Sequence, residues 1–136
     1  MLEVERRLSL ATRADEVWDR IGDFGDLSWH PAAKATDLLD SGDFIQRIVT
    51  LPDDAVIIER LDDMDDVGKS YFYSIVESPL PVSAYRSTLV VTAVEDGCEV
   101  SWRSEFEANG VDDESAKNAV AGIYEAGFSA LAKLFR

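Results

Sequence analysis

Residues 99–134, EVSWRSEFEANGVDDESAKNAVAGIYEAGFSALAKL, change their apolar pattern once, at the turn signal Asn109-Gly110. Before this turn the side chains alternate, and the apolar parity predicts a strand with one buried face, formed by Val100, Trp102, Ser104 and Phe106. After it, apolar residues recur every three or four positions, which is typical of a long amphipathic helix. The stripe facing the sheet comprises Ala116, Val120, Ile123, Gly127, Leu131 and Leu134.

The N-terminal part has the same kinds of signal in a different order. Residues 2–10 alternate as a half-buried strand does. Thr12 and Asp15 have the spacing of a capping box, and a short amphipathic helix follows, carrying Val17, Trp18, Ile21 and Phe24. A second short helical turn is predicted around Leu27 and Trp29, ended by Pro31.

Residues 35–108 read as six antiparallel strands separated by turn signals rich in Gly, Pro, Asp and Ser. The whole order predicts an α+β protein with a helix-grip fold. Its parts are a curved seven-stranded antiparallel sheet around a long C-terminal helix, with two short helices after the first strand. Because no repeat or linker interrupts the chain, residues 1–136 are predicted to form a single domain. Space between the concave sheet and the helix is the candidate ligand site.

Composition narrows the functional classes. The chain of 136 residues has 27 acidic and 13 basic residues, a net charge of −14, which would repel nucleic acids and anionic membranes. No apolar run is long enough to cross a bilayer and no export signal is visible, so we expect a cytoplasmic protein, monomer or homodimer, with no membrane insertion. Because Cys98 and His30 are each the only one of their kind, no metal and no cofactor are predicted.

Two charged residues fall on apolar parities of predicted strands. Arg47 shares its parity with Ile45 and Val49, and Glu59 shares its parity with Ile57 and Leu61. A charge on an inner face needs a partner, so the simplest arrangement is an ion pair across adjacent strands. Such a pair is either structural, or catalytic with arginine holding an oxygen and glutamate moving a proton.

Other candidates for the cavity wall are aromatic or lie on the helix stripe. Tyr73 and Tyr85 have inward parity and would give a flat apolar wall with one polar group each, unless they only bond to the backbone. His30 is expected to face solvent beside Trp29, which could plug the end of the cavity. The remaining predicted ligand-binding residues are Trp102, Val120, Ile123 and Gly127, the last leaving room for a ligand or for a close strand.

Four segments together resemble one family. They are DEVWDRIGDFGDLSWHP (15–31), IIERLDDMDD (57–66), YSIVESPLPVSAYRSTLVV (73–91) and the strand with Trp102. They are similar to the polyketide cyclase/dehydrase-like branch of the START and birch-pollen-allergen superfamily (SRPBCC), whose members bind lipids, hormones or polyketides or catalyse cyclisation. The resemblance covers almost the entire chain, and it implies the same helix-grip fold.

Two relatives within this superfamily imply site residues. By resemblance to plant abscisic-acid receptors, Leu51-Pro52-Asp53-Asp54 occupies the position of a gate loop, and Ser78 to Val82, with Pro79, Leu80, Pro81 and Val82, that of a latch loop. The chain lacks the receptors' own gate and latch sequences, and the prolines could simply shape a hairpin. By looser resemblance to the onion lachrymatory-factor synthase, Arg47 and Glu59 match an arginine and a glutamate of its cavity.

Three functions follow as hypotheses. The first is binding of a small hydrophobic, oxygen-bearing ligand. The second is a metal-free cyclase/dehydratase-like lyase or isomerase, with Glu59 as acid/base and Arg47 stabilising an oxyanion. The third is an interaction module that holds a basic partner on the acidic outer face of the sheet.

Overall fold

Nine regular elements make up the part of the chain that the computed structural model describes, residues 1–135. The strands are β1 (Leu2–Leu10), β2 (Ala35–Asp40), β3 (Ile45–Thr50), β4 (Val56–Asp65), β5 (Ser70–Glu77), β6 (Val82–Val94) and β7 (Gly97–Ala108). The helices are α1 (Ala14–Ile21) and α2 (Asp113–Leu134). The seven antiparallel strands and the long terminal helix confirm the predicted α+β class.

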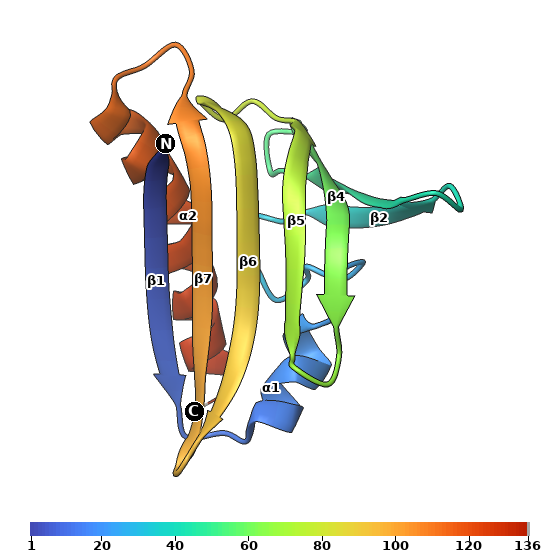
Figure 1. The fold of residues 1–136 in the computed structure, drawn as a ribbon, viewed down its shortest axis with the longest axis vertical. Helices are drawn as coiled ribbons and strands as arrows, with labels where there is room; N and C mark the ends of the chain where they lie inside the picture. Colours follow the sequence, from blue (N-terminus) through green and yellow to red (C-terminus); the bar gives the residue numbers. More distant parts are fainter. Residues whose placement is uncertain (136) are drawn as a thin grey trace.

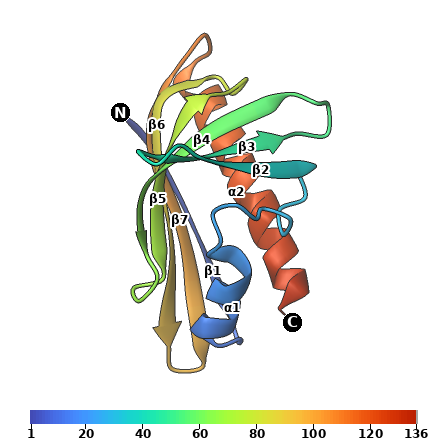
Figure 2. The ribbon, with the colours of Figure 1, turned by 90° about the vertical axis from the view of Figure 1, so that its right-hand side faces the viewer.

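The sheet has the strand order β1-β7-β6-β5-β4-β3-β2, so the first strand pairs with the last (Figure 1). In the side view of Figure 2, β2 and β3 cross the molecule toward α2 while β1, β7 and β6 stand upright. The sheet thus curls around the helix, and α1 with residues 22–34 fills part of the space between them. This arrangement is the helix grip that the element order predicts.

The core joins the inner face of β7 to one stripe of α2. All four inward residues predicted on β7, Val100, Trp102, Ser104 and Phe106, are buried. On α2 the buried stripe includes Tyr124 and Phe128 as well as the predicted Val120 and Leu131, whereas Leu134 is half exposed. The Asp112 side chain accepts a hydrogen bond of 2.7 Å from the Ser115 amide and caps the first turn of α2.

One prediction about the N-terminal region is wrong. A single helix, α1, follows β1, and residues 22–34 form turns instead of a second helix. Isolated backbone bonds over three residues, such as His30 N–H to Leu27 O at 2.9 Å, close these turns, and Pro31 has no N–H with which to extend them.

The predicted capping box at Thr12 is also wrong, because α1 starts one residue later. Arg13 is the cap residue of α1 and makes no side-chain cap bond. The Thr12 hydroxyl instead donates to the Phe135 carbonyl at 3.3 Å, and so it satisfies an acceptor at the far end of α2.

Strand β6 contains a bulge that sets the direction of its side chains. The register with β7 shifts between Ser83 and Arg86, where Ala84 has a left-handed φ of 53°. Because of this extra residue, Val82 and Tyr85 are both buried although they differ in parity. The bulge thereby turns Tyr85 inward, onto the same face as Ser87 and Leu89.

Strand β2 is one of the two edge strands of the sheet, the other being β1, and it projects at the side of Figure 1. Within residues 1–135 it pairs only with β3, and Leu38 and Leu39 are 51% and 50% exposed. The surrounding segment, residues 35–67, has ten acidic residues but only two basic ones, Arg47 and Arg60. Much of the molecule's negative charge is therefore concentrated around this edge.

Candidate functional site

A cavity of about 70 Å³ lies between the concave sheet and α2. Its apolar walls come from β3, β4, β5, β7 and α2, from residues 27–33 and from the loop residues Leu51 and Leu80, and its polar groups are those of Arg47, Glu59, Tyr73, Tyr85 and His30. The remaining lining residues are Leu27, Ala32, Ala33, Val49, Leu51, Ile57, Ile75, Leu80, Trp102 and Ile123. A mostly apolar hollow with a few convergent polar groups is the usual form of a small-molecule site.

Arg47 and Glu59 form an ion pair at this cavity. The two residues are direct partners in the β3–β4 register, and Nε of Arg47 lies 2.7 Å from Oε1 of Glu59. Nη1 of Arg47 also donates to the Phe24 carbonyl at 3.1 Å, and the guanidinium carbon lies 4.1 Å from the centre of the Phe24 ring. The structure therefore brings together the two residues that strand parity pointed inward.

One nitrogen and one oxygen of the pair have no protein partner. Among residues 1–135 no hydrogen bond involves Nη2 of Arg47 or Oε2 of Glu59. Both residues line the cavity. A ligand oxygen could accept from Nη2, and a ligand hydroxyl could donate to Oε2.

The electrostatics keep Arg47 charged. Burial alone lowers the pKa of its guanidinium, but the Glu59 carboxylate, together with Tyr71 and Tyr73, raises that pKa above its ordinary value. A positive charge in a nearly dry site is suited to stabilising negative charge on a bound oxygen.

Beside the pair, a hydroxyl cluster links the sheet to α2. Oη of Tyr73 lies 3.4 Å from Oη of Tyr85, which is hydrogen-bonded to Oη of Tyr124. Trp102 donates from Nε1 to Tyr73 at 3.0 Å, and its ring stacks on Tyr124 with centroids 4.2 Å apart. Burial raises the pKa of Tyr73 and Tyr85 well above their ordinary value and that of Tyr124 to about 12, so all three are neutral near pH 7.

Tyr124 is a site residue that the sequence analysis missed. It lies four positions after Val120 and three before Gly127, so the helix stripe itself could have identified it. Ser87, which hydrogen-bonds to Tyr124 at 3.1 Å, had the right parity but was not singled out as a site residue.

The expectation that His30 faces solvent is wrong. Its side chain is buried, Nε2 donates to the Ile123 carbonyl at 2.8 Å, and Nδ1 accepts from the Ala32 amide at 3.1 Å. Burial lowers the pKa of this imidazole, although the bond to Ile123 opposes the shift. The reason for the burial is Gly127: a Cβ there would lie 2.8 Å from Cδ2 of His30 and 3.1 Å from Cζ3 of Trp102.

Three predicted ligand-binding residues lie in the core instead of on the cavity wall. The space at Gly127 is taken by His30 and Trp102 and is not free for a ligand. Trp29 packs against these same two rings and does not line the cavity, and Val120 is fully buried. The predicted residues that do line the cavity are Arg47, Glu59, Tyr73, Tyr85, Trp102 and Ile123.

Each of the two predicted loops, residues 51–54 and 78–82, contributes one leucine to the cavity wall. Leu51 and Leu80 are partly buried on the cavity wall, Pro81 is also partly buried, and Pro52 and Pro79 are exposed. Val82 is not a loop residue, because it begins β6 and is buried. The Leu80 loop is held by bonds from the Leu80 amide to Ser78 Oγ at 2.9 Å and from the Asn109 amide to the Pro81 carbonyl at 3.0 Å.

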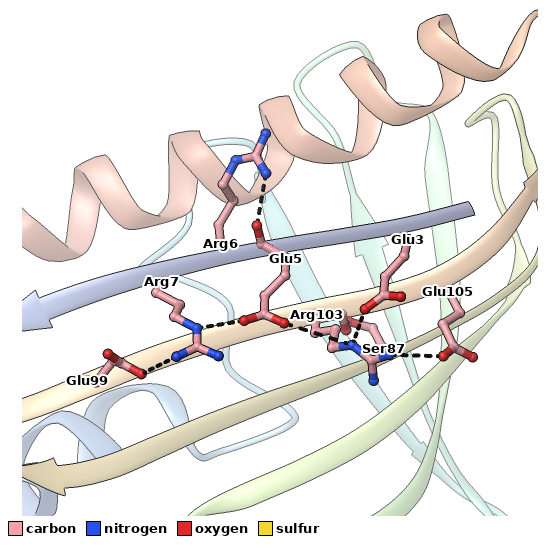
Figure 3. A network of polar contacts seen from close by, with 8 residues as sticks. All are labelled: Glu3, Glu5, Arg6, Arg7, Ser87, Glu99, Arg103 and Glu105. Atoms are coloured by element: carbon pink, nitrogen blue, oxygen red, sulfur yellow. Dashed lines mark hydrogen bonds and ion pairs between the residues drawn. The ribbon is translucent and has the colours of Figure 1, made fainter. Parts of the chain in front are cut away.

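The outer face of the sheet carries a ladder of paired charges, drawn in Figure 3. Arg103 reaches Glu3 at 2.6 Å and Glu105 at 3.1 Å, and Arg7 reaches Glu5 at 2.6 Å and Glu99 at 3.4 Å. Because arginines lie between these glutamates, this part of the outer face is not a bare acidic surface.

Within residues 1–135 no group of three or more His, Cys, Asp or Glu side chains could hold a metal ion, and no helix is long and apolar enough to cross a membrane.

Comparison with known proteins identifies a matching family and solved structures with the same fold. A family model described as polyketide cyclase / dehydrase and lipid transport matches residues 1–136. The protein XoxI from Bacillus cereus is 33% identical, with a TM-score of 0.93 over 99% of this chain and 96% of its own. A protein from Bacillus thuringiensis is 34% identical, with a TM-score of 0.93 over 98% of both chains.

A more distant structure has the same fold. The Zhui aromatase/cyclase from Streptomyces sp. R1128 is 16% identical, with a TM-score of 0.72 over 97% of this chain and 89% of its own. No match was found among the curated proteins.

Proposed function

The chain belongs to the polyketide cyclase/dehydrase and lipid transport family, and on this premise we propose that it binds a small hydrophobic, oxygen-bearing molecule, such as a lipid, polyketide or hormone-like compound, between the sheet and α2. The observation that carries the proposal is the Arg47–Glu59 pair, whose Nη2 and Oε2 make no hydrogen bond to the protein at a mostly apolar cavity. A cytoplasmic location and a monomeric or homodimeric state are part of the same proposal.

The size of the cavity sets a condition on the ligand. Its volume of about 70 Å³ is small, whereas pockets for drug-sized molecules measure roughly 300 to 1,000 Å³. A ligand of more than a few heavy atoms therefore requires Leu51 and Leu80 to move apart. Both are partly buried residues of the loops that border the cavity.

Native mass spectrometry of the gently purified protein tests the proposal. We expect a fraction of the protein to carry a small organic molecule, and the double variant Arg47→Met/Glu59→Leu to carry less of it. If the wild-type protein carries no such molecule and no ketone, alcohol or fatty acid perturbs the NMR signals of Tyr73, Tyr85 or Ile123, the binding function is refuted.

A second candidate is a cyclase- or dehydratase-type enzyme. Glu59 would take a proton from the substrate and return it to a leaving hydroxyl, while Arg47 holds the oxygen on which negative charge develops. The free Oε2 of Glu59 favours this reading, because a purely structural ion pair needs no open carboxylate oxygen. If Glu59→Gln abolishes turnover of the co-purified molecule but keeps its affinity, the protein is an enzyme. Equal loss of affinity with no turnover identifies a carrier.

A further inference from the structure

Four hydroxyl groups beside the cavity form a line with a fixed group at each end. At one end the Trp102 Nε1–H, which can only donate, lies 3.0 Å from Oη of Tyr73. At the other end the Arg103 carbonyl, which can only accept, lies 2.9 Å from Oγ of Ser87. Between these ends Tyr73, Tyr85, Tyr124 and Ser87 follow one another in hydrogen-bonding contact.

The fixed ends determine which way every proton points. Because the Arg103 carbonyl has no proton, Ser87 must donate to it, and the 3.1 Å contact between Ser87 and Tyr124 must then use the Tyr124 proton. Tyr124 therefore accepts from Tyr85, and Tyr85 accepts from Tyr73. With one proton on each hydroxyl, no other assignment satisfies all of these contacts.

The bonds in this chain are unequal. The contact between Tyr73 and Tyr85, at 3.4 Å, is longer than the usual 2.5 to 3.0 Å of an O–H···O bond. The protons of Tyr85, Tyr124 and Ser87 are directed along the chain and away from the cavity. The Tyr73 proton, in the longest of these contacts, is the most weakly held of the four, and Tyr73 lines the cavity.

We propose that Tyr73 is the hydroxyl donor that selects a ligand with an oxygen acceptor, and that Tyr85 and Tyr124 are positioning residues that cannot take its place. This inference rests on the proposed binding function. The ligand group that suits this donor is an uncharged acceptor such as a ketone or an ester carbonyl. When such an oxygen accepts the hydrogen bond of the Tyr73 hydroxyl, the Tyr85 oxygen no longer accepts one from Tyr73. Every hydroxyl proton still has an acceptor, so the exchange costs little.

A matched pair of probes tests the inference. Cyclohexanone and methylenecyclohexane have the same ring and nearly the same shape, but only the ketone carries an acceptor. NMR titration of the wild-type protein with each probe, followed at Ile75, Tyr85 and Ile123, gives the two affinities. We expect the ketone to bind about five- to tenfold more tightly, which corresponds to one net hydrogen bond.

Two conservative variants separate the donor from its neighbour. In Tyr73→Phe the preference for the ketone should vanish, whereas in Tyr85→Phe it should persist or increase, because the Tyr73 proton no longer has a competing acceptor. Thermal melts and NMR dispersion verify that both variants fold. Should Tyr73→Phe fail to fold, Tyr85→Phe still decides: loss of the preference in that variant makes Tyr85 the donor and overturns the inference.

Failure of the inference differs from failure of the binding function. If both probes bind the wild-type protein equally, or the preference survives in Tyr73→Phe, the cavity binds ligands but Tyr73 does not select them. If neither probe perturbs the NMR signals of any cavity residue, both the proposed binding function and the inference are refuted.

Discussion

Arg47 and Glu59 lie directly opposite one another on β3 and β4, with Nε and Oε1 2.7 Å apart and side chains only 1% and 10% exposed. Removing charged groups from water costs several kcal/mol, and the pairing offsets this cost only while both partners are present. We therefore predict that Glu59→Gln or Arg47→Met lowers the free energy of unfolding by about 3 to 5 kcal/mol, measured by urea denaturation.

The double variant Arg47→Met/Glu59→Leu should recover most of that loss, because it leaves no unpaired charge in the core. As a control, Glu99→Gln, which removes a partner of the exposed Arg7, should change the free energy of unfolding by less than about 1 kcal/mol. A double variant as unstable as the single ones would mean that the pair is retained for stability, which weakens its assignment to ligand binding.

His30 should make stability depend on pH. Its pKa is lowered from 6.5 by burial, so below pH 6.5 the unfolded chain takes up this proton before the folded protein does. The contribution is fully present above pH 6.5 and decreases as the pH falls toward the lower folded-state pKa. We expect the wild-type protein to lose more unfolding free energy between pH 7.5 and pH 5.5 than His30→Gln, in urea denaturation at both pH values. Equal losses would show that His30 is not the titrating group.

Two glycines of α2 should respond to alanine in opposite directions. At Gly122 a Cβ meets nothing within 4 Å, so Gly122→Ala should stabilise the protein by about 0.5 to 1 kcal/mol through helix propensity. At Gly127 a Cβ would collide with two packed rings, those of His30 and Trp102, so Gly127→Ala should cost about 1 to 3 kcal/mol despite the same propensity gain. Thermal unfolding of both variants measures the contrast, and a stabilised Gly127→Ala would contradict the tight packing there.

Leu80 should control entry to the cavity. Leu80→Ala removes part of the wall, so association and dissociation of cyclohexanone should both become faster, as measured by NMR line shapes. Pro52→Ala is the matched control, because Pro52 is exposed in the other loop and should leave both rates unchanged. Unchanged rates in Leu80→Ala would mean that ligands enter elsewhere.

Alternation and helical periodicity were sufficient to predict most of the fold. Val100, Trp102 and Phe106 each lie on the predicted face, because one buried face forces a period of two in an antiparallel strand. Parity also placed Arg47 and Glu59 inward. The prediction of a second short helix was wrong because Trp29 and Leu27 lie in turns and are nevertheless buried. Burial alone does not distinguish a turn from a helix.

Alternation and helical periodicity do not predict contacts between segments that are distant in the sequence. Nothing local to Gly127 indicates that a histidine about a hundred residues earlier fills its space, and the helix stripe can identify Tyr124 as buried but not as the partner of Tyr85 and Ser87. The size of the cavity likewise depends on how rings from several elements pack, which no single stretch of sequence determines.

The open edge at β2 has a consequence for handling the protein in solution. Near neutral pH the net charge of −14 keeps copies apart, but close to the isoelectric point of about 4.3 that repulsion disappears. Leu38 and Leu39 then lie on an unprotected strand that can pair with a neighbouring copy. We expect turbidity to increase steeply on acidification toward pH 4.3, and Leu39→Lys to delay its onset. The acidic residues thus give the protein colloidal stability where its architecture leaves a strand unpaired.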